Sequence, residues 1–479
     1  MRMVSMDEQS RKNPFQEAFE RLRARRWEMS RTTARERIAR LEKLRRAIVE
    51  RREAIYQAIH KDFRKPAAEV ETTEILMALT EIDHIVKNLA KWMKPRKVGT
   101  PVLLTGTRSE VRYEAKGVVL IISPWNYPFQ LLIAPLVAAV AAGNCVLLKP
   151  SEKTPHTAAL IDQLIRDVFD PSEVTVALGG PEVSQALLEL PFDHFFFTGG
   201  PKVGRKVMEA AAKFLAGVTL ELGGKSPAVV DETADLDAAA ERIAFGKFIN
   251  GGQTCVAPDY VMVHASKEAE FLSKLGQTLA RFYGTTEEAR KATPDFCRMV
   301  DDGQFNRVNK LLERSVASGV RVVEGGTADP TSRYIAPTVL ADVKPDSPIM
   351  EEEIFGPVLP VLRYQRLDEA VRQIREGTKP LAMYIFSHDR QNIERLLSET
   401  SAGGTCVNTT VVHFSNADLP FGGIGESGVG NYHGEFGFRT FSHERAVLRQ
   451  GPLSFLRTMF PPYTEKVRKM QRMATRLFE

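Results

Sequence analysis

Cysteine is scarce in this sequence, and its scarcity excludes two classes of protein. The 479 residues include four cysteines, and no two of them form a CxxC pair. Small disulfide-stapled domains and the common zinc modules need closely spaced cysteines, so neither is expected. The nine histidines contain no HExxH pair, which is the motif of zinc proteases. We therefore expect no metal site.

The sequence also lacks an apolar run long enough to cross a membrane. Its longest run, residues 131–142, has 12 residues and contains a proline, whereas a spanning helix needs about 20. The first fifteen residues, MRMVSMDEQSRKNPF, have no apolar segment of the kind that marks a secretion signal. With 43% hydrophobic and 26% charged residues, the composition is typical of a globular protein. The length of 479 residues suggests two or three domains. We expect a soluble, cytoplasmic protein.

The charge has no strong overall sign, but both ends of the chain are basic. The formal net charge is +5, residues 1–60 hold 16 Lys and Arg against 9 Asp and Glu, and residues 451–479 hold 6 against 2. Basic segments can bind nucleic acid or an anionic membrane. No RRM, zinc-finger or helix-turn-helix signature accompanies them, so we expect solvated helix faces and no nucleic-acid partner.

The alternation of strand-like and helix-like segments predicts an α/β fold. Thr33 and Glu36 have capping-box spacing, and apolar residues recur behind them at helical intervals, so the first hundred residues should be mainly helical. Short apolar runs then indicate strands buried on both faces of parallel sheets, which predicts two doubly wound, Rossmann-like domains. A strand pair is expected within 100–116 and the domain junction near 221–224. The expected strands are 117–123, 145–148, 195–197, 227–230, 260–264, 320–323 and 381–387, with a helix at 157–169.

Two glycine-rich segments resemble nucleotide-binding loops to different degrees. Residues 423–428 match GxGxxG, but they follow no strand and open no helix, so we expect only a shaped loop there. Residues 199–204 follow a predicted strand and precede a helix expected at 207–214, where backbone N–H groups can hold a pyrophosphate. Arg205-Lys206 replaces the Lys-Ser/Thr pair of a Walker loop, so a nucleoside triphosphate is not expected. A dinucleotide site and a plain strand–helix turn both remain open.

Three residues could take part in catalysis, and each also has a purely structural interpretation. Cys255 lies between two glycines and a proline, in a constrained loop where a thiol could act as a nucleophile if a base lies nearby. Glu221 ends an apolar run, so desolvation could raise its pKa toward that of a general base, but it could equally be a solvated strand-edge acid. The Asn126 amide, in a turn bracketed by prolines, could stabilise an oxyanion or only the turn.

Taken together, the motifs resemble those of the aldehyde dehydrogenase superfamily over about residues 15–450. Glu221 and Cys255 also stand in the family order, 34 residues apart. The ending from Ser427 to His443 is most similar to class 3 members, which include fatty and aromatic aldehyde dehydrogenases. The resemblance is carried by Pro124-Trp-Asn-Tyr-Pro128, Leu148-Lys-Pro-Ser-Glu152, Phe197-Thr-Gly-Gly200, Leu220-Glu-Leu-Gly-Gly-Lys225, Gly251-Gly-Gln-Thr-Cys255, Glu352-Glu-Ile-Phe-Gly-Pro357 and Leu419-Pro-Phe-Gly-Gly-Ile-Gly425.

The resemblance implies a mechanism for the catalytic residues. Cys255 would attack an aldehyde to form a thiohemiacetal, while the Asn126 side chain and the Cys255 backbone N–H hold the oxyanion. Hydride transfer to a nicotinamide would leave a thioester, and Glu221 would activate the water that hydrolyses it. The expected reaction is NAD(P)-dependent oxidation of a medium- or long-chain aliphatic, aromatic or polyene aldehyde to the carboxylic acid.

The resemblance also implies a cofactor site. Lys149 and Glu152 would contact the adenosine ribose, Glu353 would contact the nicotinamide ribose, and Phe355 would brace the nicotinamide. A carboxylate at Glu152 favours NAD, although NADP stays open because class 3 relatives often accept both. Gly200 departs from the family, which commonly has Ser there. The remaining expected cofactor contacts are Trp125, Gly199, Gly200, Gly204 and Leu222.

The family fold implies domain boundaries and a homodimer. The NAD(P)-binding domain would comprise 1–97 and 117–222, the catalytic domain 223–402, and a small β oligomerisation arm 98–116 with 403–450. The tail, 451–479, is basic and amphipathic. We expect the tail to pack against the partner subunit, with peripheral membrane contact as the less favoured alternative.

Two other functions and the substrate itself remain open at this level. A coenzyme A-acylating relative would release the thioester, but such relatives typically lack the glutamate found at 221. A catalytically silent binding or structural protein is disfavoured because all three catalytic residues are intact. The candidate substrate contacts, chosen by their neighbourhood, are Tyr127, Leu131, His413 and Phe414.

Overall fold

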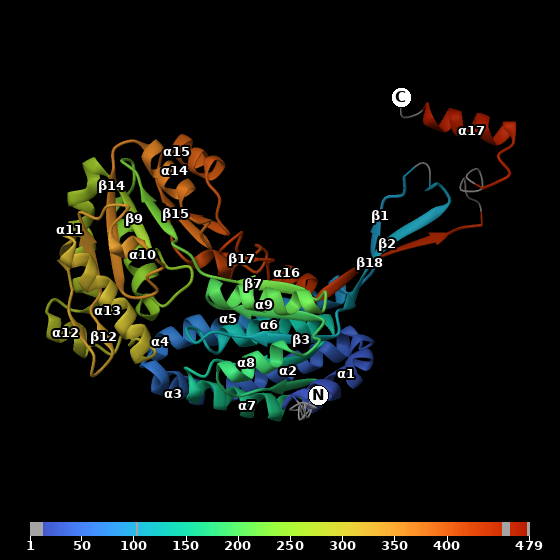
Figure 1. The fold of residues 1–479 in the computed structure, drawn as a ribbon, viewed down its shortest axis with the longest axis horizontal. Helices are drawn as coiled ribbons and strands as arrows, with labels where there is room; N and C mark the ends of the chain where they lie inside the picture. Colours follow the sequence, from blue (N-terminus) through green and yellow to red (C-terminus); the bar gives the residue numbers. More distant parts are fainter. Residues whose placement is uncertain (1–12, 102–103, 453–459, 477–479) are drawn as a thin grey trace, which may run out of the picture.

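Two α/β lobes and a narrow arm make up the molecule (Figure 1). The computed structural model describes residues 13–101, 104–452 and 460–476. Parts of the predicted tail, 453–459 and 477–479, lie outside the described residues. Across the three described ranges, we find no helix with the length and apolarity that crossing a membrane requires.

The first lobe contains a six-stranded sheet with the order β17-β7-β6-β3-β4-β5. Neighbouring strands run parallel except β17, which pairs antiparallel with β7. Every residue of β3, β4 and β6 is buried, which explains the continuous apolar runs in the sequence. The strands are β3 (Val118–Ile122), β4 (Cys145–Lys149), β5 (Val174–Val176), β6 (His194–Thr198), β7 (Gly217–Glu221) and β17 (Gly428–Val429).

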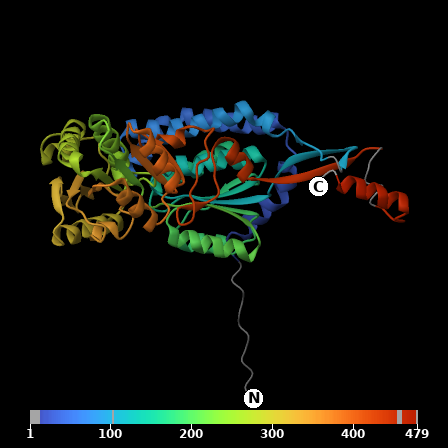
Figure 2. The same ribbon diagram turned by 90° about the horizontal axis from the view of Figure 1, so that it is seen from above.

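Helices cover both faces of this sheet, as the doubly wound prediction requires. Val119 and Ile121 pack toward α2, α5, α6 and α7, whereas Val118 and Leu120 pack toward α1, α8 and α9. Figure 2 shows the sheet between α5 on one side and α9 on the other. The helices are α1 (Gln16–Ser30), α2 (Ala34–Glu50), α3 (Arg52–Phe63), α4 (Ala67–Val70), a π-helical turn η1 (Glu71–Ile75), α5 (Leu76–Trp92), α6 (Gln130–Ala142), α7 (Pro155–Val168), α8 (Pro181–Leu188), α9 (Pro201–Lys213) and α16 (Gly434–Thr440).

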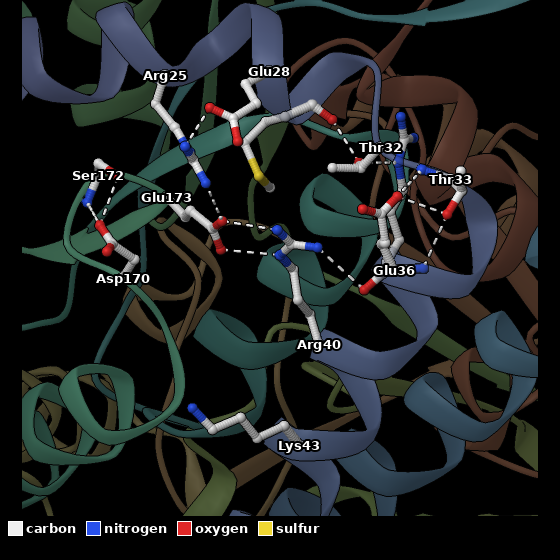
Figure 3. Close-up of polar contacts among 12 residues, drawn as sticks. Arg25, Glu28, Thr32, Thr33, Glu36, Arg40, Lys43, Asp170, Ser172 and Glu173 are labelled. Carbon is white, nitrogen blue, oxygen red and sulfur yellow. Dashed lines mark hydrogen bonds and ion pairs between the residues drawn. The ribbon is translucent and has the colours of Figure 1, made fainter.

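An ion-pair network attaches the N-terminal helices to the edge of this sheet (Figure 3). Glu173, just before β5, accepts hydrogen bonds from Arg40 at 2.8 and 3.0 Å, and Arg25 lies 3.5 Å away. The Arg40 hydrogen bonds lower the pKa of the Glu173 carboxyl. The same view shows the predicted capping box at the start of α2, in which the Glu36 N–H donates to the Thr33 hydroxyl at 3.3 Å and the Thr33 N–H donates to the Glu36 carboxylate at 2.7 Å.

The second lobe contains a seven-stranded sheet with the order β10-β13-β14-β9-β8-β15-β16. The strand expected at 320–323 is β10, which lies at the edge and runs antiparallel to β13. Strands β13, β14 and β16 were not expected from the sequence, and β14 contains a proline, Pro360. The strands are β8 (Pro227–Val230), β9 (Tyr260–His264), β10 (Arg321–Glu324), β13 (Thr338–Ala341), β14 (Val358–Tyr364), β15 (Ala382–Phe386) and β16 (Gly404–Val407).

This second sheet is also covered on both faces. Helices α10 and α11 pack on one face, and α13, α14 and α15 pack on the other. The main helices are α10 (Leu236–Phe248), α11 (Glu268–Tyr283), α12 (Glu287–Ala292), α13 (Asp302–Ala317), α14 (Leu367–Glu376) and α15 (Arg390–Glu399). The short elements are η3 (Ile249–Gly252), η4 (Ala265–Lys267), η5 (Pro348–Met350), η6 (Val412–Ser415), β11 (Ala328–Asp329) and β12 (Tyr334–Ile335).

The arm is a three-stranded antiparallel sheet that extends away from the first lobe (Figure 1). It consists of β1 (Arg96–Val98), β2 (Thr107–Ala115) and β18 (Ser442–Gln450). The described part of 100–116 thus holds one strand instead of the expected pair, and that strand pairs with β18 over its full length. Of the predicted arm segment 403–450, only β18 joins this sheet, because β16 and β17 belong to the two lobes. Helix α17 (Glu465–Thr475) lies beyond the arm.

Candidate active site

A left-handed turn places Cys255 between the two lobes. Asn250, Gly251 and Gly252 have φ angles of 55°, 59° and 74° within η3, just before the cysteine. A Cβ at Gly252 would lie 2.2 Å from the carbonyl oxygen of Gly356, so only glycine fits there. The turn leaves Cys255 half-buried at the wall of a cleft.

The turn that holds Asn126 is hydrogen-bonded directly to the cysteine loop. The Asn126 side-chain amide is buried and donates to the carbonyl of Gln253 at 3.0 Å. In return, the Asn250 amide donates to the Asn126 carbonyl at 2.9 Å. Gln253 and Asn250 were not predicted, although Gln253 lies inside the motif that contains Cys255 and Asn250 directly precedes that motif.

Glu221 lies at the end of β7, beside other buried polar groups that end neighbouring strands. Neither carboxylate oxygen has a hydrogen-bond partner among the described residues, and burial raises the pKa of Glu221 well above its ordinary value. The hydroxyls of Ser123 after β3 and Thr198 at the end of β6 also lack partners in the described ranges. Buried polar groups are normally hydrogen-bonded, so these three side chains at neighbouring strand ends are suited to bind a polar ligand or water.

A cleft of about 870 Å³ opens at these strand ends. The rings of Trp125 and Phe355 meet edge-to-face across 5.3 Å on its wall. Helix α9 begins at the cleft, with Gly200 as its N-cap and no side-chain cap, so its first N–H groups can receive a phosphate. The structure therefore brings most of the expected catalytic and cofactor residues together. Those lining the cleft are Trp125, Asn126, Gly199, Gly200, Glu221, Leu222, Cys255, Glu353 and Phe355.

Three expected cofactor residues lie outside the cleft lining. Lys149, buried at the end of β4, forms an ion pair of 2.7 Å with Glu152. Gly204 lies inside α9, because this helix begins at Pro201 and not near 207 as expected. There a Cβ would come within 2.8 Å of Leu222, so Gly204 brings the helix close to the strand end.

The electrostatic environment keeps the cysteine protonated in the absence of a base. Burial, together with the charges of Glu353 and Glu221, raises the pKa of Cys255 to about 12. Backbone N–H groups of Cys255 and Val256 act in the opposite direction but are outweighed. Burial and the charge of Asp259 likewise raise the pKa of Glu353 to about 8. A base must therefore assist the thiol.

A second, mainly apolar cavity of about 170 Å³ meets the cleft at Cys255. Tyr127 and Phe414 line it, as expected for substrate contacts, whereas His413 turns away and places its Nδ1 3.3 Å from the Cys406 sulfur. Both cavities share Leu131, Thr198, Glu221, Leu222 and Cys255. Other lining residues come from distant segments and were missed: Thr72, Thr73, Met77, Phe245, Ile249, Val411, Val412, Phe421, Tyr432 and His433.

Comparison with known proteins assigns the family. The sequence model described as the aldehyde dehydrogenase family matches residues 4–447. The chain belongs to the aldehyde dehydrogenase family. It is 45% identical to the 4,4'-diaponeurosporen-aldehyde dehydrogenase of Staphylococcus aureus over 89% of this chain and 92% of that protein. It is 44% identical to human aldehyde dehydrogenase family 3 member B1 over 91% and 92% of the two chains.

Solved structures share the fold of this aldehyde dehydrogenase. A substrate-bound AldH of Staphylococcus aureus superposes with a TM-score of 0.91 at 43% identity, covering 95% of this chain and 98% of that one. A Mycobacterium tuberculosis aldehyde dehydrogenase in complex with NAD+ gives 0.82 at 27% identity, covering 91% and 89%. The α/β fold, the class 3 resemblance and the assignment as an oxidoreductase of the aldehyde group are thereby confirmed. A nicotinamide cofactor and a small aldehyde substrate are supported as classes.

Proposed function

We propose that this aldehyde dehydrogenase oxidises apolar aldehydes of medium or long chain, aromatic or polyene type to carboxylic acids. The observation that carries the proposal is the position of Cys255, where a large cleft of dinucleotide size meets a smaller, mainly apolar cavity. A cofactor held in the cleft and an aldehyde held in the cavity would meet beside this sulfur. Glu221 lines both spaces and can serve both halves of the reaction.

The first half of the reaction forms a bond between the Cys255 sulfur and the aldehyde carbon. Glu221 accepts the thiol proton, since its raised pKa makes the carboxylate a ready proton acceptor. The carbonyl π electrons move to oxygen as the C–S bond forms. An amide has two N–H donors, and Gln253 engages only one of those of Asn126, so the other can hold the oxyanion together with the Cys255 backbone N–H.

The second half releases the acid from Cys255. After oxidation, the acyl group is held as a thioester on the sulfur. Once Glu221 has passed the thiol proton to solvent, its carboxylate removes a proton from water, and the water oxygen attacks the thioester carbon. The C–S bond breaks and Cys255 leaves as a thiolate, so the carboxylic acid departs and the sulfur is ready for the next aldehyde.

The cleft residues fit a nicotinamide dinucleotide. When bound, this cofactor supplies the acceptor for the hydride that the oxidation removes. Glu353 and Phe355 would hold the nicotinamide end, and the N-terminus of α9 would face the pyrophosphate. The ion-paired Lys149 and Glu152 would contact the adenosine ribose. We propose NAD as the preferred cofactor, because the Glu152 carboxylate repels a 2′-phosphate, with NADP accepted more weakly.

The lining of the apolar cavity supports the substrate class. Aromatic and aliphatic side chains from α6, α10 and the 411–433 segment dominate it, and apolar lining selects for an apolar ligand. The 4,4'-diaponeurosporen-aldehyde in the name of the staphylococcal relative supports the long-chain and polyene end of this range. Tyr127, Leu131 and Phe414 are the proposed contacts, while His413 would act only through its packing.

We also propose a homodimer formed through the arm. Strand β18 pairs with β2 on one edge, and no described strand pairs with its other edge. An unpaired edge strand is a natural site for association with a second copy. The basic tail, of which α17 is the described helix, would then pack against the partner subunit.

Nicotinamide reduction with an aldehyde panel tests the proposal. Short, long-chain and aromatic aldehydes are assayed with NAD and NADP, with and without coenzyme A. Cys255→Ala should abolish turnover, and Glu221→Gln should leave at most one slow turnover, because the thiol loses its base and any thioester that forms persists. Cys145→Ala is the matched control, since Cys145 is buried in β4 away from both cavities and should keep its activity. Strict dependence on coenzyme A would favour the acylating alternative, and no reduction with any aldehyde would overturn the proposal.

A further inference from the structure

Three charged side chains lie behind the two loops that carry Asn126 and Cys255. Lys65, Glu69 and Glu74 come from the segment that joins α3 to α5, far in sequence from either loop. Lys65 and Glu74 are completely buried and form an ion pair of 2.9 Å. We refer to these three residues as the charge cluster. Buried ion pairs contribute little to stability, so stability alone does not explain why Lys65 and Glu74 lie behind these loops.

Glu74 holds the turn that contains Asn126. One carboxylate oxygen accepts the backbone N–H groups of Phe129 and Gln130 at 3.2 and 2.9 Å, at the start of α6. The other oxygen accepts a hydrogen bond from the Lys65 ammonium, which also lies 3.9 Å from the centre of the Tyr127 ring. The turn residues on the C-terminal side of Asn126 are therefore bound to the same charge pair.

Glu69 holds the loop that contains Cys255. Its carboxylate accepts the backbone N–H of Asn250 at 2.9 Å, at the start of the left-handed turn. The two loops also meet directly, because the Tyr127 hydroxyl lies 2.7 Å from the Thr254 hydroxyl. The short segment from Lys65 to Glu74 thus contacts both catalytic loops at their backbones.

A π-helical turn lets neighbouring side chains of this segment face two different parts of the site. Helix α4 passes into η1, a five-residue π turn, before α5 continues. Extra residues of this kind rotate the helix face and are frequent at functional sites. Here Glu74 points inward to the Asn126 turn, while Thr72 and Thr73 line the apolar cavity.

We propose that Lys65, Glu69 and Glu74 are positioning residues, which hold the Asn126 turn and the Cys255 loop at the separation that one carbonyl group requires. The inference rests on the proposed function, because it assumes that Asn126 and Cys255 act on the same carbonyl. A displacement of about 1 Å between such groups can lower a rate by about two orders of magnitude. The charged groups act through backbone N–H groups and do not touch the substrate.

A double-mutant cycle tests this role. Glu74→Gln keeps the shape and an acceptor oxygen but removes the charge that binds Lys65. We expect it to lower kcat at least about tenfold while the Kd for NAD+ changes less than about twofold. In an Asn126→Ala background the same change should have less than about a twofold effect, because Glu74 acts through Asn126.

Asp62→Asn is the matched control. Asp62 is also a buried carboxylate that accepts two backbone N–H groups, from His156 and Thr157 at 3.0 Å each, but it caps α7 and lies away from the two loops. This variant should keep the wild-type kcat. An equal loss of kcat from Asp62→Asn, equal effects of Glu74→Gln in both backgrounds, or an unchanged kcat in folded Glu74→Gln would each overturn the inference.

Two further measurements keep the test decisive. If Glu74→Gln does not fold, Lys65→Met with Glu74→Gln removes both members of the buried ion pair, so neither is left without the other, and the cycle is run with that pair. The alkylation rate of Cys255 by iodoacetamide needs no aldehyde and should change in the cluster variants but not in Asp62→Asn. If the wild type oxidises no aldehyde, the proposed function fails, while this alkylation rate still decides the role of the cluster.

Discussion

At the scale of single residues, we expect Glu221 to set the response of the rate to pH. Burial without a partner in the described structure raises the pKa of its carboxyl, so the proton-accepting form becomes more populated as pH rises. We expect kcat to increase with pH by about tenfold per unit below that pKa and to level off above it. Steady-state rates measured across the pH range check this expectation. A flat profile in the wild type would contradict it.

The glycine at 252 is expected to be required for the shape of the cysteine loop. Gly252→Ala would place a Cβ 2.2 Å from a backbone oxygen, at a φ of 74° that side chains rarely adopt. Overpacking combined with backbone strain should lower the free energy of unfolding by about 2–4 kcal/mol. Denaturant unfolding measures this loss. Gly99→Ala, with no atom within 4 Å of the added Cβ, is the control and should be near neutral.

Residue roles could be predicted only where the residues stand together in a motif. Cys255, Glu221 and Asn126 were expected from short segments, and the structure places all three on one cleft. His413 and Phe414 were chosen for neighbourhood alone, and only Phe414 faces the cavity. Thr72 and Met77 line it from a helix more than a hundred residues away, and no spacing in the sequence connects them to Cys255.

At the scale of elements, the N-terminal helices are attached to the first sheet by Glu173. Its pKa is lowered, mainly by hydrogen bonds from Arg40, so the stabilisation is present above the unfolded pKa and is lost as pH falls through the folded value. Glu173→Gln should lower the free energy of unfolding by about 1–3 kcal/mol at neutral pH, and the difference should shrink in acid. Unfolding at several pH values measures it.

A more exposed ion pair is the comparison for this prediction. Asp162 and Arg166 pair across one turn of α7, with side chains that are 18% and 72% exposed. Asp162→Asn should change the free energy of unfolding by no more than about 0.5 kcal/mol. Equal losses from Asp162→Asn and Glu173→Gln would show that Glu173 has no special part in docking the N-terminal helices.

Elements with a strong pattern were predicted, and those with a weak pattern were not. The fully buried strands β3, β4 and β6 read as apolar runs because both of their faces are covered. Strand β14 carries a proline, so it was missed although six of its seven residues are buried. Helix α9 begins earlier than expected because Pro201 suits the first turn of a helix.

At the scale of the whole molecule, the arm is where we expect association. Leu448 on β18 is a large apolar residue that is 49% exposed, on a strand with one edge unpaired in the described residues. Analytical ultracentrifugation should give a mass of twice 53.5 kDa. Leu448→Lys should raise the dissociation constant of the dimer at least about tenfold, because a charge replaces an apolar side chain that we expect the dimer to bury. A monomeric wild type would contradict this expectation.

The sequence by itself determined the family and the fold class, and it predicted the central chemical groups. These depend on short contiguous motifs and on the alternation of buried runs, both of which are local properties of the chain. The cytoplasmic location, the domain boundaries and the dimer stay predictions. Tertiary structure alone decided that the dinucleotide-sized cleft and the apolar cavity meet at Cys255, and that a distant charged segment lies behind both catalytic loops. The physical reason is that cavities and buried ion pairs form between segments remote in sequence, whose approach is set by the packing of the whole fold.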